Sequence, residues 1–171
     1  MGSLLYNSVV TGIYTTNAPE ACHYQVEHSD AEVIVVETND MLKRFTLTLK
    51  SLPKVKAIVV WGEKALPVEE KDPRFFLWKD FLKLGAQVAD SVILEKIPRM
   101  RPGECCCLIY TSGTTGMPKG CMLSHDSLVW EMCPTFVEVQ KSCPEINVRD
   151  HRIVSYLPLS HIAGLTVDIM G

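Results

Sequence analysis

The chain has 171 residues, 47% of them hydrophobic, which is enough for one ordinary domain with a sizeable core or for a piece of a larger one. The chain has 17 Lys and Arg residues and 20 Asp and Glu residues, which give a formal net charge of −3. This charge argues against a nucleic-acid or anionic-membrane partner. No apolar run approaches the roughly 20 residues of a transmembrane helix, so no transmembrane segment is predicted.

Strand-like and helix-like segments alternate over the first half of the chain. Short runs rich in β-branched residues predict strands at 9–14, 31–37 and 55–61. Apolar residues three or four apart predict helices at 38–52 and 75–88, and Pro19 and Glu20, which suit a first helical turn, predict a helix at 17–28. Asn17 is placed to cap the first helix and Pro53 to end the second. This alternation predicts an α/β fold, with a mostly parallel sheet flanked by helices.

The second half of the chain opens with a break at Pro98 to Gly103. A strand is expected at 105–110, and a returning strand at 121–123. Ser124 then begins a helix whose core-facing stripe consists of Leu128, Met132, Phe136 and Val139. Pro134 interrupts this pattern and is expected to kink or end the helix near Cys133.

The seven cysteines and the start of the chain indicate a reducing compartment. Seven is an odd number, and neighbours within Cys105 to Cys107 cannot easily pair with one another. No C-x-x-C pair supports a zinc or thioredoxin-like site. The start, MGSLLYNSVVTG, lacks the features of a secretory signal. We therefore expect buried free thiols in a cytoplasmic protein.

The segment between the two later strands, residues 110–120, reads YTSGTTGMPKG. Glycines let backbone N–H groups approach an anion closely, the hydroxyls add donors, and Lys119 adds a mobile positive charge, so a polyphosphate is the favoured ligand. A flexible surface loop is one alternative, but a spacer gains nothing from following a strand directly. A Walker-type kinase or GTPase is a minor alternative, because Pro118 and Gly120 break the G-x-x-x-x-G-K-[ST] spacing.

This segment resembles the phosphate-binding signature of the AMP-forming acyl-CoA synthetases and their adenylating relatives. GIYTTNAPEAC at 12–22 and VSYLPLSHIAG at 154–164 resemble the bubblegum-type long-chain fatty acid CoA ligases in particular. The resemblance covers nearly the whole chain. It implies that residues 1–171 are a partial AMP-binding (adenylation) domain, a portion of the large N-terminal domain of these enzymes. The C-terminal part of that domain and the small C-terminal lid domain would then be absent.

The resemblance also implies the site residues. The loop around the ATP phosphates would be formed by Thr111, Ser112, Gly113, Thr114, Thr115, Gly116 and Lys119. Thr115 would lie near Mg²⁺, and Lys119 would act catalytically on the leaving pyrophosphate. His161, otherwise readable as a core or edge residue, would face the acid and the adenylate. Because a carboxylate is already ionised near neutral pH, we expect His161 to position the acid rather than act as a general base.

The implied activity is that of a long-chain fatty acid–CoA ligase using ATP, Mg²⁺ and coenzyme A. The fatty acid would become an acyl-adenylate and then a thioester. Because the expected ribose-binding and lid-lysine elements have no match, we expect the chain alone to be inactive. Two alternatives stay open, a non-catalytic nucleotide-binding or interaction module and an adenylating enzyme for another carboxylic acid. Peripheral contact of the full enzyme with intracellular membranes also stays open.

Overall fold

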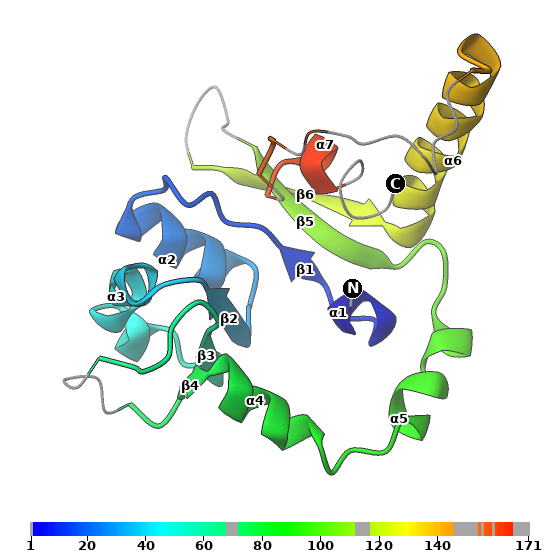
Figure 1. Ribbon diagram of the computed structural model, residues 1–171. Coiled ribbons are helices and arrows are strands. Elements are labelled where there is room, and N and C mark those ends of the chain that lie inside the picture. Colours follow the sequence, from blue (N-terminus) through cyan, green and yellow to red (C-terminus); the bar gives the residue numbers. More distant parts are fainter. Residues whose placement is uncertain are drawn as a thin grey trace. The chain divides into compact units, whose positions relative to one another are not determined.

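The computed structural model describes residues 2–67, 72–111, 117–145, 154, 156–158 and 160–165 (Figure 1). The chain divides into two units. Unit 1 combines residues 1–14 with residues 93–171, and unit 2 consists of residues 15–92. Each unit holds one three-stranded sheet.

Unit 2 combines a parallel sheet with several helices, drawn from blue to green in Figure 1. Across the sheet, its strands are β2 (Val33–Val36), β3 (Ala57–Val60) and β4 (Phe75–Leu77). Both pairings are parallel, with Ile58 opposite Ile34 on one side and Phe75 on the other. The helices are α2 (Pro19–His28), α3 (Asn39–Thr46), the 3-10 helix η1 (Leu49–Ser51) and α4 (Trp78–Gly85). The predicted α/β class is confirmed.

The core of unit 2 surrounds the central strand β3. Ile58, Val59 and Val60 have no exposed surface, as expected for a parallel strand with a neighbour on each side and cover on both faces. Helix α3 contacts β2 and β3 and contributes Leu42 and Phe45, which are also buried. The β-branched run and the amphipathic helix that follows β2 therefore produce the core that their spacing predicts.

Unit 1 has a mixed sheet in the order β1-β5-β6, formed by β1 (Val10–Thr11), β5 (Cys105–Thr111) and β6 (Lys119–Ser124). Strand β1 is parallel to β5, and β6 is antiparallel to β5. The helical elements are α1 (Gly2–Leu5), α5 (Ser91–Leu94, at the boundary between the units), η2 (Ile97–Arg99), α6 (His125–Ser142) and α7 (Ile162–Gly164). Among the described helices, none combines the length and apolar character needed to cross a bilayer.

The core of unit 1 is a small cluster of Cys106, Cys107 and Leu128. Five partly buried apolar residues pack against it, namely Leu4, Ile109, Leu123, Ile162 and Leu165. Helix α6 begins at the predicted cap, where the Ser124 side chain accepts a hydrogen bond from the Ser127 amide at 3.1 Å. This cluster therefore joins the sheet, α6 and α7 into one packed body.

Three predicted helices need correction. The cap of α2 is Ala18, which makes no side-chain hydrogen bond, so the prediction that Asn17 caps this helix is wrong. The segment 38–52 is not one helix, because α3 ends at Thr46 and η1 follows separately. The helix predicted at 75–88 begins only at Trp78, since Phe75 to Leu77 pair with β3 as a strand. Pairing with a distant strand outweighs the local helical spacing there.

Three further predictions are only partly right. Strand 9–14 is reduced to the two residues of β1. Helix α6 does not end near Cys133 but continues past Pro134 to Ser142, because the exposed ring costs it one hydrogen bond while Leu128 and Met132 anchor the preceding turns. All seven thiols are free, but they are not all buried, since Cys121 and Cys133 are exposed.

Candidate functional site

The candidate site lies where the β5–β6 hairpin ends (Figure 1). The antiparallel register places Thr111, the last residue of β5, opposite Lys119, the first residue of β6. Both side chains are exposed. The other predicted loop residues, Ser112, Gly113, Thr114, Thr115 and Gly116, lie outside the described residues. The sheet thus brings the two ends of the phosphate-loop motif to one place.

Tyr110 and Gly120 form the base of this hairpin, directly below the paired Thr111 and Lys119. Tyr110 is buried, and its ring lies against Gly120, where an added Cβ would be 3.3 Å from the ring carbon Cζ. A side chain at position 120 would therefore compete with the Tyr110 ring for the same space. Glycine at position 120 therefore leaves room for the Tyr110 ring beside β6.

Lys119 supplies the positive charge of the site. Its ammonium group makes no ion pair with any described carboxylate, although other exposed lysines of the chain, such as Lys54 and Lys56, do. The exposed Lys119 ammonium and the Thr111 hydroxyl opposite it together form a set of donors that fits the oxygens of a polyphosphate.

His161 is held by its own backbone surroundings. Its amide donates a hydrogen bond to the Pro158 carbonyl oxygen at 2.8 Å, and its Nδ1 accepts one from the Ala163 amide at 3.2 Å. It therefore caps α7. Because Nδ1 accepts, the proton of the neutral ring belongs on Nε2. The exposed imidazole can thus present an N–H donor to a ligand, in agreement with a positioning role rather than that of a base.

Two contacts place the His161 segment on the sheet. Ser160 lies against Gly12, which follows β1, and Ile162 packs against the Cys106 cluster of β5. No hydrogen bond or ion pair joins His161 to Thr111 or Lys119 within the described residues. Thr111 and Lys119 are therefore paired in the sheet, and His161 belongs to the same unit without a described hydrogen bond to either of them.

The thiols beside the hairpin are poor candidates for nucleophiles. Burial, together with the neighbouring thiols Cys106, Cys105 and Cys121, raises the pKa of Cys107 to about 12. Burial also raises the pKa of Cys106. Thiols with raised pKa values are almost wholly protonated at neutral pH, so Cys106 and Cys107 act as core residues.

A groove of about 560 Å³ runs between α6 and α7. Its apolar lining consists of Leu123, Leu128, Met132, Phe136, Ile162 and Ala163. The sequence predicted the stripe on α6 as core-facing but held no sign of a groove, because the groove depends on where residues 162 and 163 lie. It begins at the residue that follows His161.

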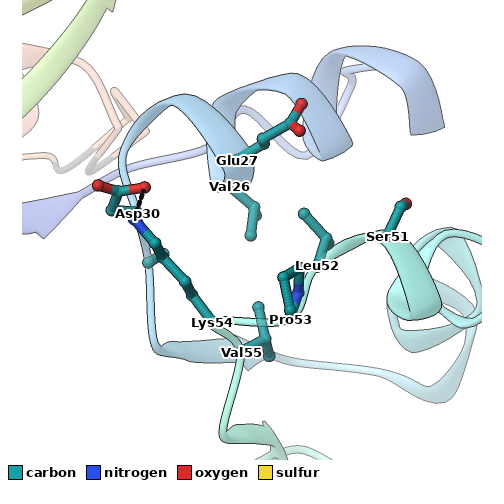
Figure 2. A pocket seen from close by; sticks show the side chains of 9 residues that line it. Val26, Glu27, Asp30, Ser51, Leu52, Pro53, Lys54 and Val55 are labelled. Carbon is teal, nitrogen blue, oxygen red and sulfur yellow. Dashed lines mark ion pairs between the residues drawn. The ribbon is translucent and has the colours of Figure 1, made fainter.

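A second cavity, of about 240 Å³, lies in unit 2 between the end of α2 and the segment before β3 (Figure 2). Val26, Leu52 and Val55 form its apolar wall, and all three are almost fully buried. The ion pair between Lys54 and Asp30, 2.6 Å long, stands at its rim. None of the described site residues lines it, so we regard it as a packing space of the unit 2 core.

Comparison with known proteins gives a consistent result. A family profile described as AMP-binding enzyme matches residues 1–171. The chain is 44% identical to the long-chain-fatty-acid–CoA ligase ACSBG2 of Gallus gallus and 41% identical to that of Xenopus laevis, in each case over 99% of the chain. The solved structure of the anthranilate CoA ligase AuaEII in complex with anthranoyl-AMP matches with a TM-score of 0.56 and 24% identity, over 73% of this chain and 22% of that one.

These matches differ in what they cover. The chain spans only 22% of the length of the two curated relatives. The solved structure, below 25% identity, supports the fold alone.

Proposed function

The chain belongs to the AMP-binding enzyme family, and from this premise we propose that it forms the phosphate-holding part of a long-chain fatty acid–CoA ligase. The observation that carries the proposal is the register of the β5–β6 hairpin. It places Thr111 opposite Lys119, at the two ends of TSGTTGMPK, and Lys119 makes no ion pair with a described carboxylate. The names of the relatives support a long-chain fatty acid as the substrate.

In this proposal Lys119 acts on the phosphates of ATP. Its ammonium would stabilise the negative charge that develops on the pyrophosphate oxygens as pyrophosphate leaves, and the Thr111 hydroxyl would add a hydrogen-bond donor. Ser112 to Gly116 would complete the loop, with the Thr115 hydroxyl near Mg²⁺. When bound, Mg²⁺ supplies further neutralisation of phosphate charge.

His161 would position the acid. Its Nε2–H can donate to a carboxylate oxygen, which orients the carboxylate toward the α-phosphorus of ATP. Attack by this oxygen forms the acyl-adenylate and releases pyrophosphate. The thiol of coenzyme A, losing its proton, then displaces AMP to give the thioester. We include in the proposal a cytoplasmic location, with contact to intracellular membranes only at their surface.

The test uses the longest natural protein product that contains this chain. We expect palmitate to support exchange of labelled pyrophosphate into ATP, and benzoate or phenylalanine to support little. Exchange that depends on benzoate or phenylalanine instead would assign the protein to another acid. ATP binding without exchange for any acid would favour the non-catalytic module. The 171-residue chain, assayed in parallel, is expected to show no turnover.

A further inference from the structure

We propose that Gly12 and Gly164 are positioning residues that fix the direction of the His161 ring, an inference that rests on the function proposed above. The two glycines are far apart in the chain but both contact the short segment just before His161, at residues 157, 158 and 160. At each glycine, backbone atoms of this segment lie so close that a Cβ atom would collide with them.

Gly12 contacts the segment just before His161. A Cβ added to Gly12 would lie 2.6 Å from the Cα of Ser160 and 2.9 Å from its Cβ. Carbon atoms in van der Waals contact are about 3.5–4.0 Å apart, so even alanine requires the backbone at Ser160 to move. Ser160 is itself buried and cannot turn toward solvent without losing this packing.

Gly164 contacts the same segment from the other end. Its added Cβ would lie 2.6 Å from the Pro158 carbonyl oxygen and 3.0 Å from that of Leu157. Neither Gly12 nor Gly164 has a left-handed backbone conformation. Conformational freedom therefore does not explain these glycines, and the close approach of the segment does.

The residues that approach the two glycines, Pro158 and Ser160, also determine the backbone position of His161. The Pro158 carbonyl that approaches Gly164 also accepts the His161 amide hydrogen bond, and Ser160 precedes His161 directly. A shift at either place would change the backbone angles at His161 and release Nδ1 from the Ala163 amide. The ring would then lose the orientation and the tautomer that present Nε2–H to the acid.

Gly103 provides the matched control. It belongs to the same unit, but no atom lies within 4 Å of the position its Cβ would take. Alanine at position 103 should therefore change nothing in the His161 segment. Comparing Gly12→Ala and Gly164→Ala with Gly103→Ala separates the effect of the close approach from the general effect of replacing a glycine.

The kinetic test measures acid-dependent and ATP-dependent pyrophosphate exchange in the full-length protein. We expect Gly12→Ala and Gly164→Ala to lower kcat/KM for palmitate by about 10- to 100-fold, because displacements near 1 Å can cost that much, while KM for ATP changes less than about twofold. Gly103→Ala should match the wild type. An equal loss in both parameters, or no loss in either variant, would overturn the proposal.

A second measurement does not depend on activity. Two-bond ¹H–¹⁵N correlation spectra of the 171-residue chain report the tautomer of His161. We expect Nδ1 to be unprotonated in the wild type and in Gly103→Ala, and a mixture of tautomers in Gly12→Ala and Gly164→Ala. This result would stand even if the wild type activated no fatty acid. The same tautomer in all four proteins, or complete unfolding of both close-approach variants, would make the glycines merely structural and refute the inference.

Discussion

The two units of the chain differ in how completely their apolar side chains are buried. In unit 2, all four residues of β3 are buried. In unit 1, Met122 on β6 is 70% exposed and Trp130 on α6 is 74% exposed. The predicted site residues all belong to unit 1. The proposed chemistry therefore belongs to the unit whose described residues form the smaller buried core.

Helix α6 shows the difference most clearly, because it has apolar residues on two faces. Leu128 and Met132 are buried against the sheet, whereas Val129, Trp130 and Val137 are exposed. Large apolar side chains exposed beside a buried stripe leave apolar surface in contact with water, which does not stabilise the fold. Unit 1 is therefore expected to be less stable than unit 2 when the 171-residue chain is studied alone.

The largest expected effect is the loss of a buried side chain from unit 2. Ile58→Ala should lower the free energy of unfolding by about 2–5 kcal/mol, because Ile58 has no exposed surface. Leu47→Ala is the control, since Leu47 is 92% exposed and its loss should change stability by less than about 0.5 kcal/mol. Urea unfolding followed by Trp61 and Trp78 fluorescence, in a Trp130→Phe background, reports on unit 2 alone. Equal effects of the two substitutions would contradict a closed core in this unit.

The next effect concerns the proposed site in unit 1. Lys119→Ala should slow adenylate formation by about 2–4 kcal/mol in activation free energy, if its ammonium stabilises the departing pyrophosphate. ATP affinity should fall less than the rate does. Lys141→Ala is the control, because this lysine is also exposed and lies in unit 1, on α6 away from the hairpin. Pyrophosphate exchange in the full-length protein, measured over a range of ATP concentrations, gives the rate and the apparent ATP affinity of each variant. If Lys119→Ala exchanges as fast as Lys141→Ala, the phosphate-loop assignment is wrong.

A smaller effect compares two helix caps, one in each unit. Ser124 caps α6 through the Ser127 amide, and Thr38 caps α3 through the Met41 amide at 3.3 Å. Replacing either by alanine should cost about 1 kcal/mol. For Ser124→Ala, the fluorescence of Trp130 is the reporter, in a variant without the two unit 2 tryptophans. If Ser124→Ala moves no unfolding transition, unit 1 has no cooperative core of its own.

The sequence predicted the elements whose signals are local. The β-branched run at 55–61 and the Ser124 cap were both placed correctly, because residue type and spacing decide them. Phe75 and Phe76 were placed in a helix because their strand depends on β3, far away in the chain. The boundary within 38–52 was also missed, because the helical spacing of apolar residues continues across the turn at Leu47 that separates α3 from η1.

The site divides in the same way. The sequence predicted a strand at 105–110 and a returning strand at 121–123, and the structure pairs these two strands with Thr111 opposite Lys119. The roles of Lys119 and His161 stay predictions. The approach of Ser160 to Gly12 was not predicted, because nothing in the local sequence announces which distant segment fills the space beside a glycine.

The smallest expected effect is an ion pair in unit 2 at the start of β4. The Asp72 carboxylate accepts hydrogen bonds from the Arg74 amide and Nε, both at 2.9 Å, and from Nη2 at 2.6 Å. The hydrogen bond from the Arg74 side chain is the largest cause that holds the pKa of Asp72 below its ordinary value, and burial opposes it. The Arg74 carbonyl in turn accepts the Ile58 amide, so this turn joins β4 to β3.

Because the folded-state pKa of Asp72 is lowered, its contribution to stability is present above the unfolded value, near pH 4, and is lost as pH falls through the folded value. The contribution should stay below about 1 kcal/mol, since both side chains are 27% exposed and lie two residues apart, where the pair can also form in the unfolded chain. Asp72→Asn should therefore lower stability slightly at pH 7 and much less at pH 3. Asp90→Asn, at an exposed position that makes no ion pair with a described residue, is the control for the general effect of replacing an aspartate. Urea midpoints of the three proteins at both pH values decide the matter, and a loss for Asp72→Asn that grows toward pH 3 would contradict a lowered pKa of Asp72 in the folded protein.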